Sequence, residues 1–189
     1  MKLGFVTAIF VAVLAFSSNA QNYYTGKRDV YSSDGTRYLI TDYSEEDWRT
    51  KSVYIKNEGN FITDDFRYKL DSTSGEYYSW ATGMGTFADV NDSVFYACVR
   101  QVFTEEEIAR YSAVPSSSIL VKFAVNPETG QVWEVEYHIH FESDRTFLSI
   151  PIDKFHALEE ALKASPVCSI SEKLRQERQS YAITNCTLF

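Results

Sequence analysis

The sequence predicts an α+β fold, with a β-rich part over residues 21–92 and an α-β-β-α-β module with an antiparallel sheet over residues 93–189. Two observations carry this prediction. Apolar residues alternate along two runs that flank the turn 126–130, as in an antiparallel hairpin with one packed face. Further on, apolar residues recur at helical spacing between 155 and 162. The two parts are short enough to form one compact domain.

The first 20 residues have the composition of a cleavable signal peptide. A positive charge at Lys2 precedes an apolar run from 3 to 16, and Ser18 and Ala20 are the small residues that a signal peptidase reads. A membrane-spanning helix needs about 20 apolar residues, and this run is shorter. No second long apolar segment follows. We therefore expect cleavage after Ala20 and a secreted or periplasmic protein with no membrane span after cleavage.

The charge balance excludes one class of partner. The chain has 18 Lys and Arg against 26 Asp and Glu, a formal net charge of −8, and its basic residues form no stripe. Because an acidic surface repels a phosphate backbone, we expect no binding of nucleic acid.

The three cysteines allow one disulfide and leave one thiol over. Cys98 lies in an apolar run and is expected to be a buried small hydrophobic residue. Cys168 and Cys186 flank the last helical segment, and export permits a disulfide between them. Such a bond closes a loop of about 18 residues and adds roughly 3 kcal/mol of stability. This pairing is preferred, and pairings with Cys98 remain open.

The β-rich part contains short runs of β-branched and aromatic residues. These runs predict strands over 38–40, 52–55 and 75–80, with turn sequences at 33–35, 57–60 and 71–75 between them. The pattern indicates an antiparallel meander with long loops.

A helix signal opens the second module. Thr104 is followed by three glutamates, so its side chain and that of Glu107 can form a capping box for a helix that runs to about Tyr111. A loop follows at 114–118, and the hairpin comes next.

The hairpin pairs a strand over 119–125 with a return strand over 133–141. Successive side chains of a strand point to opposite faces. The expected packed face of the return strand carries Trp133, Val135, Tyr137, Ile139 and Phe141, and the expected solvated face carries Glu134, Glu136, His138, His140 and Glu142.

A second helix is expected over 153–164, with Asp153 as its N-cap and Pro166 beyond its end. A further helical turn is expected over 171–179. Residues 181–187 alternate loosely and predict a closing strand against the hairpin.

The order helix, strand, glycine turn, strand, helix, strand over 104–187 resembles the C-terminal domain of TonB-type proteins. The residues that carry this likeness are 119–125, 130–135 and 157–166. The whole chain also resembles small secreted Bacteroidetes proteins of unknown function. The chain lacks the retained anchor and proline-rich linker of TonB, so the likeness does not imply energy transduction. It implies an α+β module whose relatives commonly bind other proteins.

The return strand also suggests a metal site. His138 and His140 are two residues apart and project from one face, where Glu136, or alternatively Glu134 or Glu142, can supply a third zinc ligand. The alternative is a solvated sheet face on which Lys122 of the neighbouring strand offsets the glutamates. Because such short motifs arise often by chance, the solvated face is the preferred interpretation and zinc the alternative.

Aromatic residues give a second candidate site. Tyr77, Tyr78 and Trp80 are candidate ligand-binding residues that can stack on sugar rings or anchor a protein partner, as can the upstream tyrosines. These upstream residues are Tyr23, Tyr24 and Tyr31. The alternative is that all of them are ordinary strand formers.

No strong catalytic motif is present: the chain has neither a Gly-x-Ser-x-Gly elbow nor a Cys-x-x-Cys pair. We therefore expect a non-enzymatic module that binds another envelope or secreted protein through the hairpin face or a sheet edge. The alternatives are a metal-dependent hydrolase that uses His138 and His140, and a carbohydrate-binding module that uses Tyr77, Tyr78 and Trp80.

Overall fold

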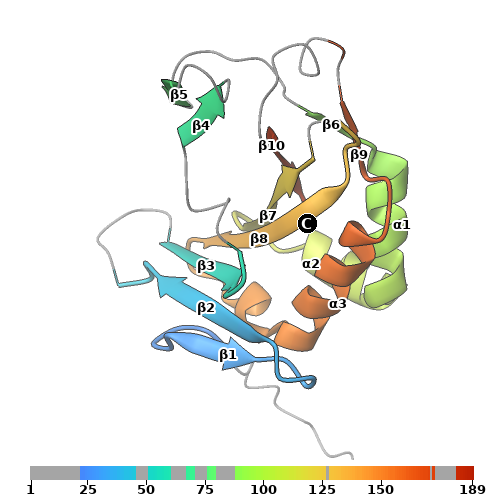
Figure 1. Ribbon diagram of the computed structural model, residues 1–189. Helices are drawn as coiled ribbons and strands as arrows, with labels where there is room; N and C mark the ends of the chain where they lie inside the picture. Colours follow the sequence, from blue (N-terminus) through green and yellow to red (C-terminus); the bar gives the residue numbers. More distant parts are fainter. Residues whose placement is uncertain are drawn as a thin grey trace, which may run out of the picture.

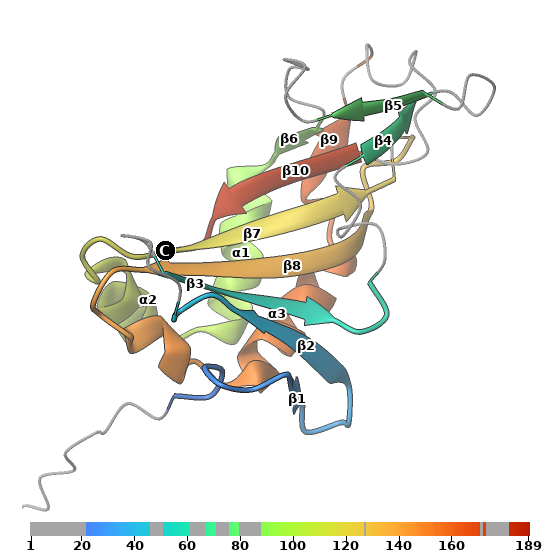
Figure 2. The same cartoon turned by 90° about the vertical axis from the view of Figure 1, so that its left-hand side faces the viewer.

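A computed structural model describes residues 22–45, 51–60, 67–70, 76–79, 88–126, 128–170, 172 and 182–189. Within these residues the protein is a two-layer α+β structure, in which one antiparallel sheet is covered on a single face by helices (Figures 1 and 2). The predicted fold class is confirmed. The expected leader 1–20 and nearly all of the expected turn at 171–179 lie outside the described residues. No described helix is long and apolar enough to cross a membrane.

The main sheet has six strands in the order β1-β2-β3-β8-β7-β10, and every neighbouring pair is antiparallel. Its strands are β1 (Asp29–Tyr31), β2 (Arg37–Asp42), β3 (Lys51–Asn57), β7 (Ser118–Val125), β8 (Val132–Phe141) and β10 (Ala182–Thr187). Strands of both predicted parts therefore share one sheet, and the predicted closing strand pairs with the hairpin as expected.

Two shorter ribbons accompany this sheet. Strand β4 (Arg67–Leu70) pairs with β5 (Glu76–Ser79), and β6 (Ala88–Val90) pairs with β9 (Cys168–Ile170). The predicted strand over 75–80 thus corresponds to β5. The helices among the described residues are α1 (Asp92–Val102), α2 (Glu105–Ser112) and α3 (Ile152–Lys163), and a 3₁₀ turn covers Thr146–Ser149.

The core lies between the sheet and the helices. The inward residues of β7 and β8 are fully buried and include Phe123 and Tyr137. Tyr137 packs against Phe155 of α3 at a ring-centroid distance of 4.6 Å and donates a hydrogen bond to its carbonyl oxygen. Phe95 of α1 meets Phe123 edge to face. Each such side chain adds about 1.5–3 kcal/mol through removal from water, so these contacts fix the helices on the sheet.

The helix caps follow from local sequence, with one correction. The predicted capping box of Thr104 and Glu107 is present. Asn91 caps α1 by accepting a hydrogen bond from the backbone N–H of Val94. Helix α3 begins one residue earlier than expected, with Pro151 at the N-cap. Asp153 is not the cap because its carboxylate instead accepts a hydrogen bond from the backbone N–H of Ser33, far away in the sequence.

Trp133 does not lie on the packed face as expected. The register of β7 and β8 shifts next to Val125, which pairs with Val132 while Ala124 pairs with Glu134. This bulge turns Trp133 outward, where it is 38% exposed, and Val132 is buried in its place.

The hairpin turn depends on Gly130. This residue has a φ of +76°, and a Cβ added to it would lie 2.3 Å from the carbonyl oxygen of Cys168 in β9. Asn126 closes the turn through its side-chain oxygen, which accepts hydrogen bonds from the backbone N–H groups of Glu128 and Thr129. The glycine therefore serves both the turn and the close approach of β9.

Candidate functional site

The first candidate is a polar cluster on the sheet face opposite the helices, formed by Lys122, Glu134, Glu136 and His138. We expected these side chains to be solvated, yet each is only 5–8% exposed. Part of the reason is visible on the neighbouring strand: Tyr54 of β3 stacks on the His138 ring at 4.0 Å, nearly parallel to it. The solvated-face interpretation is therefore wrong for these four residues.

Glu136 is the centre of this polar cluster. Its Oε1 lies 2.7 Å from His138 Nε2, and its Oε2 lies 3.8 Å from Lys122 Nζ and has no hydrogen-bond partner. In the register, Glu136 also lies opposite Lys56 of β3. The row of positive, negative and positive side chains across three strands explains how charges persist at low exposure, because buried charges require partners.

The predicted zinc ligands do not converge. His138 Nε2 is engaged by Glu136 Oε1, and the rings of His138 and His140 stand 6.3 Å apart in an edge-to-face arrangement. Within the described part of the chain, no group of three or more His, Cys, Asp or Glu residues is arranged to hold a metal ion. Burial, with a smaller effect of His138, lowers the pKa of His140. These observations give the hydrolase hypothesis no support.

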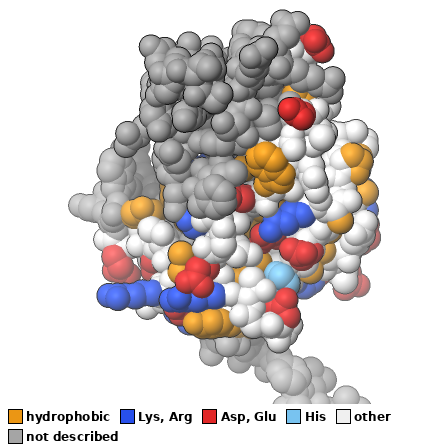
Figure 3. Space-filling view, in the orientation of Figure 1, with side chains coloured by type: hydrophobic (Ala, Val, Ile, Leu, Met, Phe, Trp, Pro, Cys, Tyr) orange, Lys and Arg blue, Asp and Glu red, His pale blue; other side chains and the backbone are white. Residues whose placement is uncertain are grey.

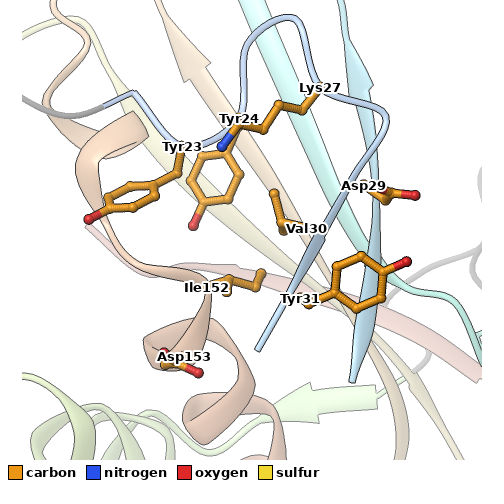
Figure 4. Close-up of a pocket in the computed structure, with 8 residues that line it drawn as sticks. All are labelled: Tyr23, Tyr24, Lys27, Asp29, Val30, Tyr31, Ile152 and Asp153. Atoms are coloured by element: carbon orange, nitrogen blue, oxygen red, sulfur yellow. The ribbon is translucent and has the colours of Figure 1, made fainter. Parts of the chain in front are cut away.

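The second candidate is an open hollow of about 480 Å³ beside β1, which we call the tyrosine hollow (Figure 4). It is lined by Tyr23, Tyr24, Lys27, Asp29, Val30, Tyr31, Ile152 and Asp153. Figure 4 shows the rings of Tyr23, Tyr24 and Tyr31 around it, with Val30 and Ile152 between them. The structure thus brings together the three upstream tyrosines that the sequence singled out as possible anchors.

The tyrosines of the hollow have different roles. Tyr24 is fully buried, and its hydroxyl donates a hydrogen bond to the carbonyl oxygen of Ile150, so it forms a rigid wall. Burial raises the pKa of Tyr24 far above its ordinary value, and the hydroxyl stays protonated. Tyr31 is 58% exposed and supplies an aromatic rim. Lys27 reaches over the Tyr23 ring with its Nζ 6.0 Å from the centroid.

The backbone of β1 is the third feature of this region. Ile40 donates a hydrogen bond to the carbonyl of Arg28, and Ser32 donates one to the carbonyl of Thr36. Bonded and non-bonded pairs alternate along an antiparallel ladder. The N–H and C=O groups of Asp29 and Tyr31 therefore point away from β2, toward the open edge of the sheet.

The other aromatic candidates belong to β5 or follow it in the sequence. Tyr77 and Tyr78 lie next to each other on β5, where Tyr78 pairs with Tyr68 of β4. Their side chains, and Trp80 as a whole, lie outside what the structure describes.

His156 of α3 has specific partners in the structure. Its Nε2 lies 3.0 Å from Asp34 Oδ2 in the β1–β2 loop, and its Nδ1 lies 2.8 Å from the Tyr38 hydroxyl. Tyr38 in turn donates a hydrogen bond of 2.7 Å to Glu159, which is fully buried. The loop and α3 are far apart in the sequence, so only the fold reveals this chain of contacts.

The predicted Cys168–Cys186 disulfide is not formed, because all three cysteines are free. Cys168 is held in β9 opposite Val90, whereas Cys186 belongs to the main sheet opposite Val121, so each thiol is fixed by a different ladder. Burial raises the pKa of Cys168 to about 12. Burial, with Cys168 as a smaller cause, also raises the pKa of Cys186. Cys98 is buried, as expected.

The surface over β1, β2 and α3 mixes acidic, basic and hydrophobic side chains (Figure 3). No broad basic area is visible among the described residues of that face, in agreement with the acidic composition.

Comparisons with known proteins identify the fold only. The sequence matches no family model and no curated protein. The structure is similar to the crystal structure of a DUF5043 family protein from Bacteroides uniformis, with a TM-score of 0.61, 18% sequence identity and 85% of each chain covered. The chain therefore shares its fold with a Bacteroidetes protein of a family of unknown function. The likeness to the TonB C-terminal domain is not supported by these comparisons.

Proposed function

We propose that this protein is a non-enzymatic binding module, secreted or periplasmic, that takes an extended segment of a partner protein as an added strand along β1. The observation that carries the proposal is the open edge of β1, where the backbone groups of Asp29 and Tyr31 face outward directly beside the tyrosine hollow. Strand addition uses such an edge for backbone hydrogen bonds and a neighbouring pocket for side-chain selection.

The opposite edge of the sheet is a weaker candidate. Strand β10 has β6 alongside it, so its outer side is already approached by another element. Strand β1 has no described strand beyond it in the sheet order. The exposed rim at Tyr31 also adds aromatic area, of the kind that dominates binding energy at protein interfaces.

The magnitudes show why the hollow matters as much as the edge. Four outward backbone groups form hydrogen bonds worth about 0.5–1.5 kcal/mol each, together about 2–6 kcal/mol. Association costs about 4–15 kcal/mol in lost freedom of motion. Backbone pairing alone therefore does not hold a partner, and burial of one large side chain in the hollow adds about 1.5–3 kcal/mol. We expect moderate affinity that depends on both features.

Two sequence features support the same proposal. The signal-peptide composition of residues 1–20 suggests export, which selects envelope or secreted proteins as partners. The resemblance of residues 104–187 to the TonB C-terminal domain suggests a module of a kind that binds proteins.

The test separates backbone pairing from side-chain contact. The purified protein is used to select binders from a phage library of random peptides, and the selected peptides are measured against Tyr31→Pro and Tyr31→Ala. Proline removes the outward N–H and leaves the pairing with β2 intact. We expect Tyr31→Ala to weaken binding several-fold and Tyr31→Pro to weaken it by a further factor of about ten. A thermal melt of each variant verifies folding.

Two results would overturn the proposal. Equal affinities of Tyr31→Pro and Tyr31→Ala would exclude pairing along β1. Failure to select any peptide, together with retention of the protein on polysaccharide that is lost in Tyr31→Ala, would assign the tyrosine hollow to sugars instead.

A further inference from the structure

The hairpin that carries β1 is fastened to α3 at two points. The backbone N–H of Ser33 donates a hydrogen bond of 2.6 Å to Asp153 Oδ1. Beside it, His156 bridges Asp34 of the hairpin loop and Tyr38 of β2. We call Asp34, Tyr38, His156 and Glu159 the hairpin latch. The latch matters because, among the described strands, β2 alone joins β1 to the rest of the sheet.

The hydrogen-bond partners of Glu159 and Tyr38 indicate where the protons of the latch lie. Glu159 accepts hydrogen bonds on Oε1 from Lys163, at 2.5 Å, and from Asn57, at 3.4 Å. An ammonium group at that distance favours the ionised carboxylate, which can only accept. The Tyr38 hydroxyl therefore donates its single proton in a hydrogen bond to Glu159 Oε2. Its oxygen, 2.8 Å from His156 Nδ1, is left to accept a proton from that nitrogen.

The partner of His156 Nε2 indicates that this nitrogen also carries a proton. His156 Nε2 lies 3.0 Å from Asp34 Oδ2. Hydrogen bonds from the Ser32 hydroxyl and then from Thr36, with a smaller effect of His156, hold the pKa of Asp34 well below its ordinary value. Asp34 is thus an ionised acceptor at every ordinary pH, and the nitrogen that faces it carries a proton.

We infer that His156 carries protons on both ring nitrogens and, as an imidazolium, latches the β1–β2 hairpin to α3 in a pH-dependent way. In the closed latch His156 contacts both Asp34 and Tyr38, and in the open latch it has lost at least one of these contacts. The closed state therefore holds one more proton than an open state with a neutral His156. Raising the pH therefore favours the open state, because equilibria shift toward the state that binds fewer protons. A neutral ring can donate to Asp34 or to Tyr38, but not to both.

The surrounding charges fit this assignment. The loop contributes Asp34, β2 contributes Tyr38, and β3 contributes only the neutral amide of Asn57. The described charged residues of α3 near the latch are Asp153, Glu159, Glu160 and Lys163, of which Lys163 pairs with Glu159 and lies 3.9 Å from Glu160. Acidic groups outnumber basic ones around the ring, so the field favours a positive charge on it.

The consequence for binding rests on the proposed function of β1. A closed latch holds the hairpin loop on α3 and keeps Asp29 and Tyr31 in line beside the hollow. An open latch lets β1 move away from Ile152 and Asp153, which form the other side of that hollow. Partner binding is thus strongest at acidic to neutral pH and weakens as His156 loses its second proton.

The first test needs no partner. Nitrogen-15 NMR of the imidazole rings at about pH 7, where a free histidine is mostly neutral, is expected to show a proton on both nitrogens of His156. Hydrogen exchange then reports on the hairpin through the amides of Ser32 and Ile40, which are bonded across β1 and β2. We expect their protection, corrected for the intrinsic rate, to fall about tenfold between about pH 7 and pH 9.5.

Matched variants isolate the latch. His156→Gln keeps a polar side chain but no titratable charge, so the hairpin amides are expected to be less protected and insensitive to pH. His140→Gln, which alters a half-buried histidine of the opposite sheet face, is expected to keep the response of the unmodified protein. Asp34→Asn provides a second disruption from the loop side, and it is expected to lower protection as His156→Gln does.

The outcomes separate the latch from the binding proposal. A single proton on the His156 ring at about pH 7, or unchanged hairpin protection in His156→Gln, would overturn the latch and leave peptide binding at β1 untouched. If NMR shows both protons on His156 but peptides bind Tyr31→Pro and Tyr31→Ala equally tightly, the latch is retained and the strand-addition function is overturned. Peptide affinity that falls with rising pH in the unmodified protein, but not in His156→Gln, would support both.

Discussion

The Gly130→Ala substitution tests how the β7–β8 turn and β9 are held together. Gly130 has a φ of +76°, and the new Cβ would lie 2.3 Å from the carbonyl oxygen of Cys168 and 3.1 Å from its carbonyl carbon. Two costs therefore add. A left-handed conformation costs an alanine about 1 kcal/mol, and the clash with backbone forces β9 to move, at about 1–3 kcal/mol. We expect a loss of about 3 kcal/mol in the free energy of unfolding.

Gly26 supplies a matched control within the same chain. Its φ is +74°, almost the same as that of Gly130, but a Cβ there would meet no atom within 4 Å. Gly26→Ala therefore carries the conformational cost without the clash, and we expect a loss of about 1 kcal/mol. Both substitutions restrict the unfolded chain equally. The difference between the two variants, about 2 kcal/mol, measures the close contact alone.

Urea denaturation followed by tryptophan fluorescence measures both variants. With a slope of about 2 kcal/mol per molar urea, we expect the midpoint to fall by about 0.5 M for Gly26→Ala and by about 1.5 M for Gly130→Ala. Hydrogen exchange should also localise the larger effect to β6 and β9, which are paired next to the turn. Equal midpoints for the two variants would refute the close approach of β9 to Gly130.

Three further predictions follow from buried polar groups. Tyr38→Phe leaves the Glu159 carboxylate without its hydroxyl partner, and we expect a loss of about 2 kcal/mol in a chemical melt; an unchanged midpoint would contradict the contact. The chain has three free thiols, at Cys98, Cys168 and Cys186. We expect all three to resist alkylation at about pH 8 in the folded protein and to react in urea, whereas a disulfide would leave a single thiol that reacts in urea. Burial lowers the pKa of His140, so the unfolded chain binds that proton more readily. Stability should therefore fall as the pH drops below about 6.5, and His140→Gln should reduce this fall in pH-dependent denaturation.

Local signals predicted the elements whose sequence period was unambiguous. The alternation of 119–125 and 133–141 gave β7 and β8, and the Thr104 capping box gave α2. Helix α1 was not predicted from the sequence, because the apolar residues around Cys98 form one continuous run that hides their helical spacing. Phe95, Cys98 and Val99 are nevertheless spaced for one helix face, and Asn91 is a good N-cap, so the helical signal was present.

Two errors on β8 arise from information that alternation does not contain. Alternation assigns side chains to two faces, but it does not say whether the second face is solvated, and Glu136 and His138 are buried there. It also assumes an unbroken register, and the bulge beside Val125 turned Trp133 to the other side. Sequence period predicts the direction of a side chain only while the ladder is regular, and it does not predict its burial.

The tyrosine hollow beside β1 shows why a candidate site is harder to predict from sequence than a fold. Tyr23, Tyr24 and Tyr31 stand out in the sequence as aromatics, but nothing local says that they face one another. What unites them is a set of distant contacts: Tyr24 donates to the Ile150 carbonyl, and the backbone N–H of Tyr23 donates to the Leu148 carbonyl. These bonds bring the first described turn onto the segment that leads into α3, and Ile152 and Asp153 then complete the hollow. A hollow assembled from segments more than a hundred residues apart is encoded in the tertiary fold, so it can be identified only after the sheet and α3 are placed.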